Sequence, residues 1–137
     1  MAEKSLWKYL KNNMKKRWDA TRHEDRVTSG VPDVSYGING VNGWIELKAM
    51  ARWPREGLRI PGFTLEQKRW LQSRDEAGGN VWIFLRIGRD YLLINGKYSF
   101  HLDAMDVSGK YPIPFKIWDG SVDWDEFAKI IGQRPPR

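Results

Sequence analysis

The sequence predicts an α/β domain in which helices pack on a mixed β-sheet. Three observations lead to this fold class. The length of 137 residues suits one domain that buries about two-thirds of its unfolded surface. A hydrophobic share of 41% with 29% charged residues is typical of a globular protein. Segments with helical spacing of apolar residues are interspersed with short strand-like segments, in the order α–β–β–α–β–β–β–α.

The first element is a helix predicted over residues 3–18. Its apolar side chains form one stripe and its lysines form another on the opposite side. The two stripes hold Leu6, Trp7, Leu10, Met14 and Trp18, and Lys4, Lys8, Lys11 and Lys15. Glu3 departs from this pattern, because its spacing to Trp7 and Leu10 puts a carboxylate on the apolar side. It is either an inward-facing acid or a first-turn residue that complements the helix dipole.

A β-hairpin follows an irregular segment that includes a short strand around residues 21–24. The hairpin consists of a strand at residues 33–36, a Gly/Asn-rich turn at 37–43 and a partner strand at 44–49. Prolines and glycines then mark residues 50–63 as a long loop.

A second helix is predicted to begin near Thr64 and to run to about Ala77. Thr64 and Gln67 have the spacing of a capping box, and Gly78-Gly79 is a typical stop signal.

The remaining segments complete the sheet and add a helix. Residues 81–87 are strongly apolar and are predicted to form a strand buried on both faces. Asn95-Gly96 is a strong hairpin signal between predicted strands at residues 91–94 and 97–102. A final helix is expected over Trp124–Ile131.

The charge balance and the composition narrow the classes of function. Twenty-three Lys and Arg against 17 Asp and Glu give a net charge of +6 and a pI of about 9.7, which favours a polyanionic partner such as nucleic acid. The absence of cysteine excludes disulfides, zinc ribbons and thiol nucleophiles. The two histidines, His23 and His101, are too far apart in the sequence for the His-pair signature of a metalloprotease.

No membrane partner is expected, and the location is expected to be cytoplasmic. The longest apolar run, residues 81–85, is far too short to span a bilayer. Lysines in the first turns of the chain are incompatible with a secretory signal.

The most informative pattern joins the two strands of the first hairpin. Asp33 begins one strand, and Glu46 and Lys48 lie on the same face of the other because side chains alternate along a strand. Hairpin pairing therefore brings two carboxylates and an ammonium together. Carboxylate oxygens are hard ligands for Mg²⁺, which activates water for phosphodiester hydrolysis, and a lysine stabilises the charge that develops on the phosphate.

Each part of this pattern has a simpler interpretation. An E-x-K triplet on a strand is often a solvated cross-strand charge pair, and Pro-Asp is a common turn dipeptide. The two parts together, in a basic single-domain chain with Glu3 on the inner side of its first helix, favour a nuclease.

These residues also resemble a known group of enzymes. Residues 30–34, Gly-Val-Pro-Asp-Val, and residues 44–48, Trp-Ile-Glu-Leu-Lys, look like the PD-(D/E)xK nuclease superfamily. The closer similarity is to small VRR-NUC-type proteins, many of them encoded by phages. The resemblance covers about residues 3–85, and further agreement comes from Glu3, Arg22, Glu24 and residues 64–70.

The resemblance implies a fold and a domain organisation. The fold is a restriction-endonuclease-like α-β-β-α-β core, extended by a C-terminal hairpin and helix. A single nuclease domain would then occupy residues 1–137, with the core at about 3–87, the hairpin and helix at 88–131 and a basic tail at 132–137.

The resemblance also implies roles for individual residues. Asp33, Glu46 and the backbone carbonyl of Leu47 would bind Mg²⁺, with Mn²⁺ as a substitute, and Lys48 would be the catalytic lysine. Glu3 would complete the site from the first helix, directly or through water. Gln67 matches a position near the active site, and its capping-box role is the alternative.

Contacts with DNA are expected to come from basic and aromatic residues around the hairpin. The candidates are Lys15, Lys16, Arg22, Arg26, Arg52, Trp53, Arg55 and Arg59. Trp53 either stacks on an unpaired base or packs on the second helix. Glu24 and His23 are open between a role near the metal or phosphate and an ordinary surface position.

The predicted function is a Mg²⁺-dependent endonuclease that acts on branched DNA, in the manner of a Holliday junction resolvase. No appended DNA-reading module is evident, which argues against sequence-specific recognition. Two cuts across a junction of two-fold symmetry require two sites, so a homodimer is expected. The alternatives are a nicking or flap nuclease in phage replication, repair or packaging, and a non-catalytic nucleic-acid-binding protein.

Overall fold

The computed structural model describes residues 2–24, 29–104 and 113–133. Arg26 and residues 134–137 of the predicted basic tail lie outside the described residues. The elements follow one another as α1 (Ala2–Met14), β1 (Asp19–Arg22), β2 (Val34–Ile38), β3 (Val41–Met50), α2 (Leu65–Glu76), β4 (Asn80–Ile87), β5 (Asp90–Asn95), the 3₁₀ helix η1 (Gly96–Ala104), β6 (Phe115–Asp119) and α3 (Trp124–Ile131).

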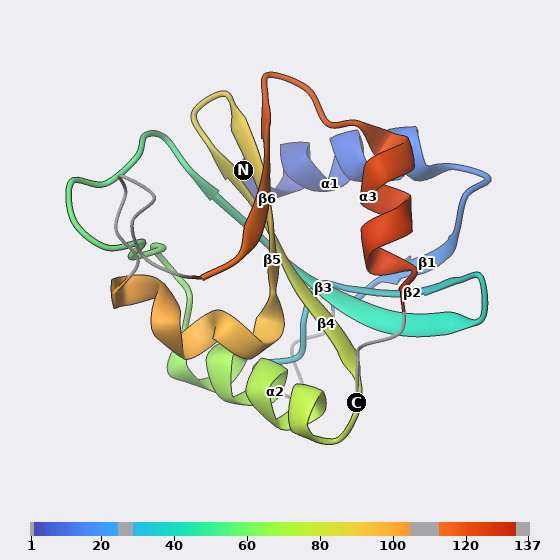
Figure 1. The fold of residues 1–137 in the computed structure, drawn as a ribbon, viewed down its shortest axis with the longest axis horizontal. Helices are drawn as coiled ribbons and strands as arrows, with labels where there is room; N and C mark the ends of the chain where they lie inside the picture. The colour runs from blue at the N-terminus through green and yellow to red at the C-terminus, as the bar shows by residue number, and fades with distance from the viewer. Residues whose placement is uncertain (1, 25–28, 105–112, 134–137) are drawn as a thin grey trace.

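The six strands form one mixed sheet in the order in which they occur in the chain (Figure 1). β3 and β4 are parallel, and every other neighbouring pair is antiparallel. The parallel pair follows from the crossover through α2, since parallel neighbours cannot be joined by a tight turn. The predicted α/β class with a mixed sheet is confirmed.

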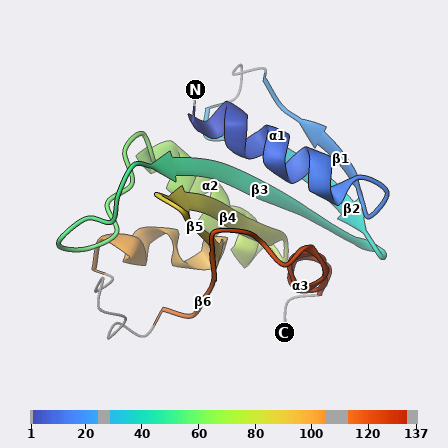
Figure 2. The same ribbon diagram turned by 90° about the horizontal axis from the view of Figure 1, so that it is seen from above.

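Helices cover both faces of the sheet, α1 and α3 on one face and α2 with η1 on the other (Figures 1 and 2). Alternating side chains of the strands supply a core to each layer. Ile45 and Leu47 pack with α1 and α3, whereas Ile83 and Leu85 of β4 pack with Leu71 of α2. Within the described residues, no helix is long and apolar enough to cross a membrane.

The last helix, α3, is hydrogen-bonded to β2 and β4, which come much earlier in the chain. The carbonyl oxygen of Ile131 accepts hydrogen bonds from the Tyr36 hydroxyl, at 2.7 Å, and from Asn80 Nδ2, at 2.8 Å. The Val122 backbone N–H donates to the Tyr9 hydroxyl at 3.0 Å. The C-terminal part is therefore integral to the core next to α1 and β2.

The first predicted hairpin is confirmed, with a tighter turn. Asn39 and Gly40 alone connect β2 to β3, and both have positive φ, 52° and 79°. This matches the two-residue turn that Asn-Gly favours, because its backbone twist fits that of the flanking strands.

The hairpin predicted at Asn95-Gly96 is wrong. Asn95 Oδ1 accepts a hydrogen bond from the Lys97 N–H at 3.0 Å, which begins η1 instead of a reversed strand. A Cβ at Gly96 would lie 2.7 Å from Val81 Cγ2, so this glycine serves close packing. β6, which the sequence did not reveal, takes the edge of β5.

The first helix ends at Met14, four residues before the predicted end. Lys16 has a φ of 69°, a left-handed conformation that an α-helix does not contain. Trp18 therefore leaves the helical stripe and packs on Tyr36, with ring centroids 5.7 Å apart.

Candidate active site

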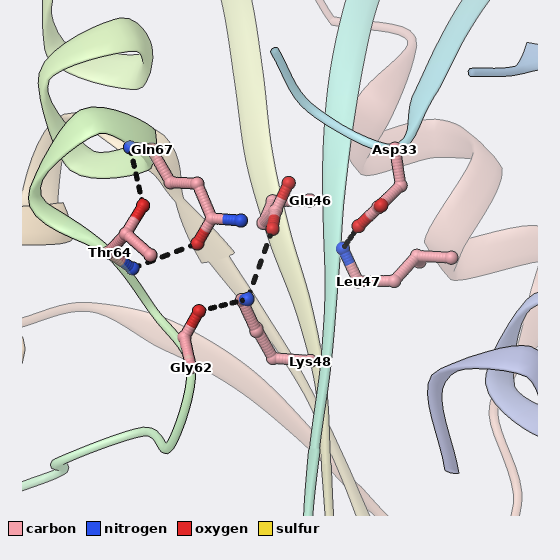
Figure 3. A network of polar contacts seen from close by, with 7 residues as sticks. All are labelled: Asp33, Glu46, Leu47, Lys48, Gly62, Thr64 and Gln67. Carbon is pink, nitrogen blue, oxygen red and sulfur yellow. Dashed lines mark hydrogen bonds and ion pairs between the residues drawn. The ribbon is translucent and has the colours of Figure 1, made fainter. Parts of the chain in front are cut away.

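Asp33 is held where two neighbouring strands part. β2 pairs with β3 from Val34, which lies opposite Ile45, to the hairpin turn. Beyond that point β3 runs on to Met50 without β2 beside it. Asp33 replaces the missing partner, because its Oδ2 accepts a hydrogen bond of 2.9 Å from the backbone N–H of Leu47 (Figure 3).

Two further contacts fix the backbone around Asp33. The His23 N–H, just after β1, donates to the Asp33 carbonyl oxygen at 2.7 Å. Gly30 lies against the first turn of α2, where a Cβ would be 2.5 Å from the Glu66 carbonyl oxygen, and its φ is 84°. Glycine is required there, so the Gly-Val-Pro-Asp sequence packs against both β1 and α2.

Glu46 and Lys48 point from β3 toward the side of the sheet that α2 covers, as the alternation predicted (Figure 3). Both side chains are buried, with residue exposures of 1% and 5%. Lys48 Nζ lies 3.3 Å from Glu46 Oε2 and donates to the Gly62 carbonyl oxygen at 2.8 Å. It also lies 5.5 Å from the centre of the Phe63 ring. The ammonium is thus fixed between a carboxylate and the end of loop 51–63.

The surroundings of Glu46 oppose its negative charge. Burial is the main reason that the pKa of Glu46 is raised to about 8. The neighbouring Asp33 carboxylate raises this pKa further, while the charge and hydrogen bond of Lys48 lower it. One lysine does not compensate two buried acids.

The two acids have the chemistry of a site for a hard cation. Ionised carboxylates only accept hydrogen bonds, and the buried Oε1 of Glu46 has no hydrogen-bond partner in the described part of the chain. Mg²⁺ is usually held by one or two carboxylates together with water. Asp33 and Glu46 therefore fit this ion.

A third acid does not join this pair. Among residues 2–24, 29–104 and 113–133, no three Asp, Glu or His side chains are close enough together to hold a metal ion. Glu3 is half-buried in the first turn of α1. Ser5 of the same turn borders a hollow with Ala49 and Met50 at the end of β3. The ligand roles of Glu3 and of the Leu47 carbonyl remain predictions.

Gln67 combines the two roles that the sequence left open. Its Oε1 accepts from the Thr64 N–H at 2.9 Å, and its own N–H donates to Thr64 Oγ1 at 3.1 Å, which confirms the capping box. The amide nitrogen of the same side chain points toward Glu46 (Figure 3). Capping α2 therefore also orients an amide at the edge of the acidic pair.

Comparison with known proteins supports the architecture. No protein-family model matches the chain, and a search of curated protein sequences finds no match. Among solved structures, the chain is similar to Archaeoglobus fulgidus Hjc, a Holliday junction resolvase from an archaeal hyperthermophile. The TM-score is 0.57 at 18% sequence identity, and the match covers 94% of this chain and 99% of Hjc. The chain has the fold of this resolvase.

The predicted arginine loop borders the site. Loop 51–63 leads from β3 to α2, and its Arg52, Arg55 and Arg59 are exposed. Its end is attached to the site through the hydrogen bond between Lys48 and Gly62. Three exposed positive charges thus lie on the segment that helps to hold the buried ammonium.

Trp53 attaches this loop to the core. Its ring is half-buried against the core on the α2 side of the sheet, and its Nε1 donates to Asp90 Oδ2 at 2.8 Å. This geometry favours packing against the core over stacking on a base, with Asp90, the first residue of β5, as a hydrogen-bond partner.

The other basic candidates differ in their distance from the site. Arg22 lies opposite Val34, next to Asp33 in the chain, and its guanidinium is 5.9 Å from the centre of the Trp7 ring. Lys15 and Lys16 follow the C-terminal end of α1, while its N-terminal end lies near the end of β3 (Figure 2). The structure does not bring these two lysines to the acidic pair.

Two features of the site were missed from the sequence. The Gly62 carbonyl, which fixes Lys48, is a backbone group of an irregular loop and leaves no sequence signal. The facing row of α2, Gln67, Trp70 and Arg74, has helical spacing i, i+3 and i+7 and was detectable in principle.

Proposed function

We propose that this protein is a Mg²⁺-dependent endonuclease that hydrolyses phosphodiester bonds in DNA, with branched DNA as its substrate. The observation that carries the proposal is the pair of buried acids, Asp33 and Glu46, with a buried lysine beside them. Oε1 of Glu46 has no donor among the residues that the structure describes. The fold shared with a Holliday junction resolvase supports the choice of substrate.

Asp33 and Glu46 would hold the ion, which when bound supplies a water molecule of lowered pKa and positive charge near the phosphate. Glu46 must be ionised to serve as a ligand. Lys48 is restrained by Glu46 and Gly62, so its ammonium is positioned to donate to a phosphate oxygen and to stabilise the charge that grows there. Gln67 presents an amide donor on the same side.

Branched DNA suits a basic domain that recognises shape and phosphates. Positive charges on loop 51–63 contact phosphates without reading base sequence. Because one chain offers one site and a four-way junction needs two cuts, we propose a homodimer as the working form. A VRR-NUC-type, phage-related enzyme that acts in the cytoplasm, with Mn²⁺ as a substitute for Mg²⁺, remains our proposal from the motifs.

The test is cleavage of four-way, flapped and linear DNA with Mg²⁺ or Mn²⁺. Asp33→Asn and Lys48→Met preserve side-chain size at buried positions, and both are expected to lower the cleavage rate by at least 100-fold. Lys129→Ala, an exposed substitution on α3, is the matched control and should retain activity. Cleavage that persists in both site variants would contradict the assignment.

A non-catalytic nucleic-acid-binding protein is the second candidate. It is favoured by one observation: the described residues gather two acids at the site, where a third was expected. Calorimetric titration with Mg²⁺ distinguishes the two. Binding that disappears in Asp33→Asn supports the nuclease, and no binding to the wild-type protein supports the second candidate. Equal cleavage of linear and branched DNA would favour a nicking or flap nuclease over a resolvase.

A further inference from the structure

A row of side chains in mutual contact lies beside the acidic pair. This row, the aromatic row, consists of His23, Trp44, Trp70 and Arg74. The His23 and Trp44 rings are tilted by 32° with centroids 5.2 Å apart, and the Trp44 and Trp70 rings meet edge to face at 66° with centroids 5.0 Å apart. The Arg74 guanidinium lies 4.4 Å from the Trp70 ring centre and 5.6 Å from that of Trp44. Such contacts hold planar groups in a defined orientation.

The fold places this row next to the site for a geometric reason. Trp44 and Glu46 are two residues apart on β3 and face the same side, so they are about 7 Å apart along the strand. Trp70 and Arg74 continue the α2 row that starts at Gln67. At the other end, the His23 backbone is hydrogen-bonded to Asp33.

The row is accessible from two sides. A hollow of about 350 Å³ borders its α2 end, and a second, of about 320 Å³, reaches Trp44 across β1 and β2. Both tryptophans are half-buried, and Arg74 and the neighbouring Arg69 are exposed. A ligand in the first hollow can therefore reach the guanidinium of Arg74 and the ring of Trp70.

The aliphatic part of the Arg74 side chain packs against Gly79. A Cβ at Gly79 would lie 2.5 Å from Arg74 Cγ and 2.8 Å from its Cδ, so the aliphatic part of the arginine lies in the space that this glycine leaves. At the other end, a hydrogen bond orients the His23 ring, since its Nε2 lies 2.7 Å from Ser35 Oγ.

The chemistry of the row suits the face of a nucleobase. Proteins bind unpaired bases by stacking them on aromatic rings or on guanidinium planes, whatever the base. In a continuous duplex both faces of each base are covered by its neighbours, whereas a base beside a branch can expose one face.

We propose that the aromatic row binds an unstacked nucleobase of the substrate strand, within a few nucleotides of the phosphate that is cleaved. The inference rests on the proposed nuclease function and extends it, because it supplies a reason for branched DNA to be preferred over linear duplex.

The experiment measures binding to a four-way junction in metal-free buffer, in which the proposed reaction does not proceed. A series of junctions carries one abasic nucleotide at each of the three positions on either side of the branch. The variants are Arg74→Lys, which keeps the charge and removes the plane, and Trp70→Leu. Arg86→Lys is the matched control, since Arg86 lies over Tyr91 on the opposite face of the sheet.

At one abasic position the wild-type protein should lose roughly tenfold in affinity, within the range of base–aromatic stacking. Arg74→Lys and Trp70→Leu should show a similar loss on the intact junction and no further loss at that position. Arg86→Lys should behave as wild type. Affinity for linear duplex and its salt dependence should be unchanged in Arg74→Lys, because no charge is removed.

The proposal would be overturned if the loss of affinity from the substitution added to the loss from the abasic nucleotide at every position. It would also be overturned if both variants bound the intact junction with wild-type affinity. A change of molecular mass in the variants, measured by light scattering, would also overturn it and would identify the row as an interface between copies. Failure of the nuclease proposal is separate, since it appears as absence of cleavage by the wild-type protein with Mg²⁺.

Discussion

Glu46 is a carboxyl group whose ionisation the fold resists. It is buried, it lies beside Asp33, and its Oε1 has no hydrogen-bond partner among the described residues. Lys48 compensates part of this charge from 3.3 Å. In the metal-free protein, the ionised carboxylate of Glu46 therefore destabilises the fold. A bound cation would compensate this negative charge.

The first prediction concerns stability against pH. The pKa of Glu46 is about 8 in the folded protein against 4.5 ordinarily, so folding favours its protonated form. The stabilisation is full below about pH 4.5 and is lost as pH rises through 8. Relative to Glu46→Gln, the metal-free wild-type protein should lose up to a few kcal/mol across this window. Chemical denaturation from pH 5 to 9 measures the difference.

Magnesium should stabilise the wild-type protein more than it stabilises Glu46→Gln. At pH 8.5 we expect saturating Mg²⁺ to raise the Tm of the wild-type protein, because a ligand that binds only the folded state stabilises it. Glu46→Gln should show little increase. Parallel pH profiles of the two metal-free proteins would contradict the assignment of the titration to Glu46.

The sequence revealed the two acids and the lysine of the site but not all of their partners. Strand alternation and hairpin pairing were sufficient to place Asp33, Glu46 and Lys48 together. The Gly62 carbonyl depends on the path of an irregular loop, which no periodicity describes. Glu3 had the predicted inward spacing, yet spacing fixes a face of a helix and not a distance to a site.

The N-terminus of α2 is defined by a capping box. The capping box of Thr64 and Gln67 satisfies backbone N–H groups at its first turn and holds the Gln67 amide near Glu46. Thr64→Ala should cost about 1 kcal/mol of stability, or about 3 °C in Tm. Ser73→Ala, exposed in the third turn of α2, is the control and should change Tm by less than about 1 °C.

Loop 51–63 depends on a glycine where it docks on η1. Gly57 has a φ of 57°, and an added Cβ would overlap the Asp103 carbonyl oxygen, while the next residue, Leu58, donates to the Leu102 carbonyl at 2.8 Å. Gly57→Ala should lose roughly 1–3 kcal/mol from the backbone conformation and more from the overlap.

Gly40→Ala separates the cost of the backbone conformation from the cost of the overlap. Gly40 also has a positive φ, 79°, but no atom lies within 4 Å of an added Cβ. Urea denaturation should therefore show a smaller loss for Gly40→Ala than for Gly57→Ala. Equal losses would contradict the overlap with the Asp103 carbonyl as a cause of destabilisation.

Two Asn-Gly pairs show why local signals are insufficient to predict an element. Asn39-Gly40 forms the tight turn between β2 and β3, whereas Asn95-Gly96 opens a 3₁₀ helix. Both lie after apolar strand-like residues. The difference is tertiary, because Gly96 packs against Val81 and the free edge of β5 is filled by β6, from about 20 residues further along the chain.

For the whole molecule, the net charge of +6 predicts DNA binding that weakens with salt. The three arginines of loop 51–63 are expected to contact phosphates. Replacing all three with glutamine should reduce the slope of log affinity against log salt by up to about 3. The measurement is a salt titration on junction and linear DNA.

A matched control removes the same formal charge elsewhere. It replaces with glutamine three exposed basic residues of the β4–β5 turn, η1 and α3, namely Arg89, Lys97 and Lys129. The slope for this control should remain close to that of the wild-type protein. Equal reductions in both triple variants would show that binding follows total charge and not the loop.

The hydrogen bonds that Tyr36 and Asn80 make to the Ile131 carbonyl bear on how the protein is synthesised. The strands that carry Asp33 and Glu46 leave the ribosome long before α3, whose Phe127 and Ile131 complete the core beneath them. A domain of this kind folds as a unit. We therefore expect a nascent chain to have no assembled acidic pair until residue 131 has emerged, so that the nuclease activity we propose would be absent during translation.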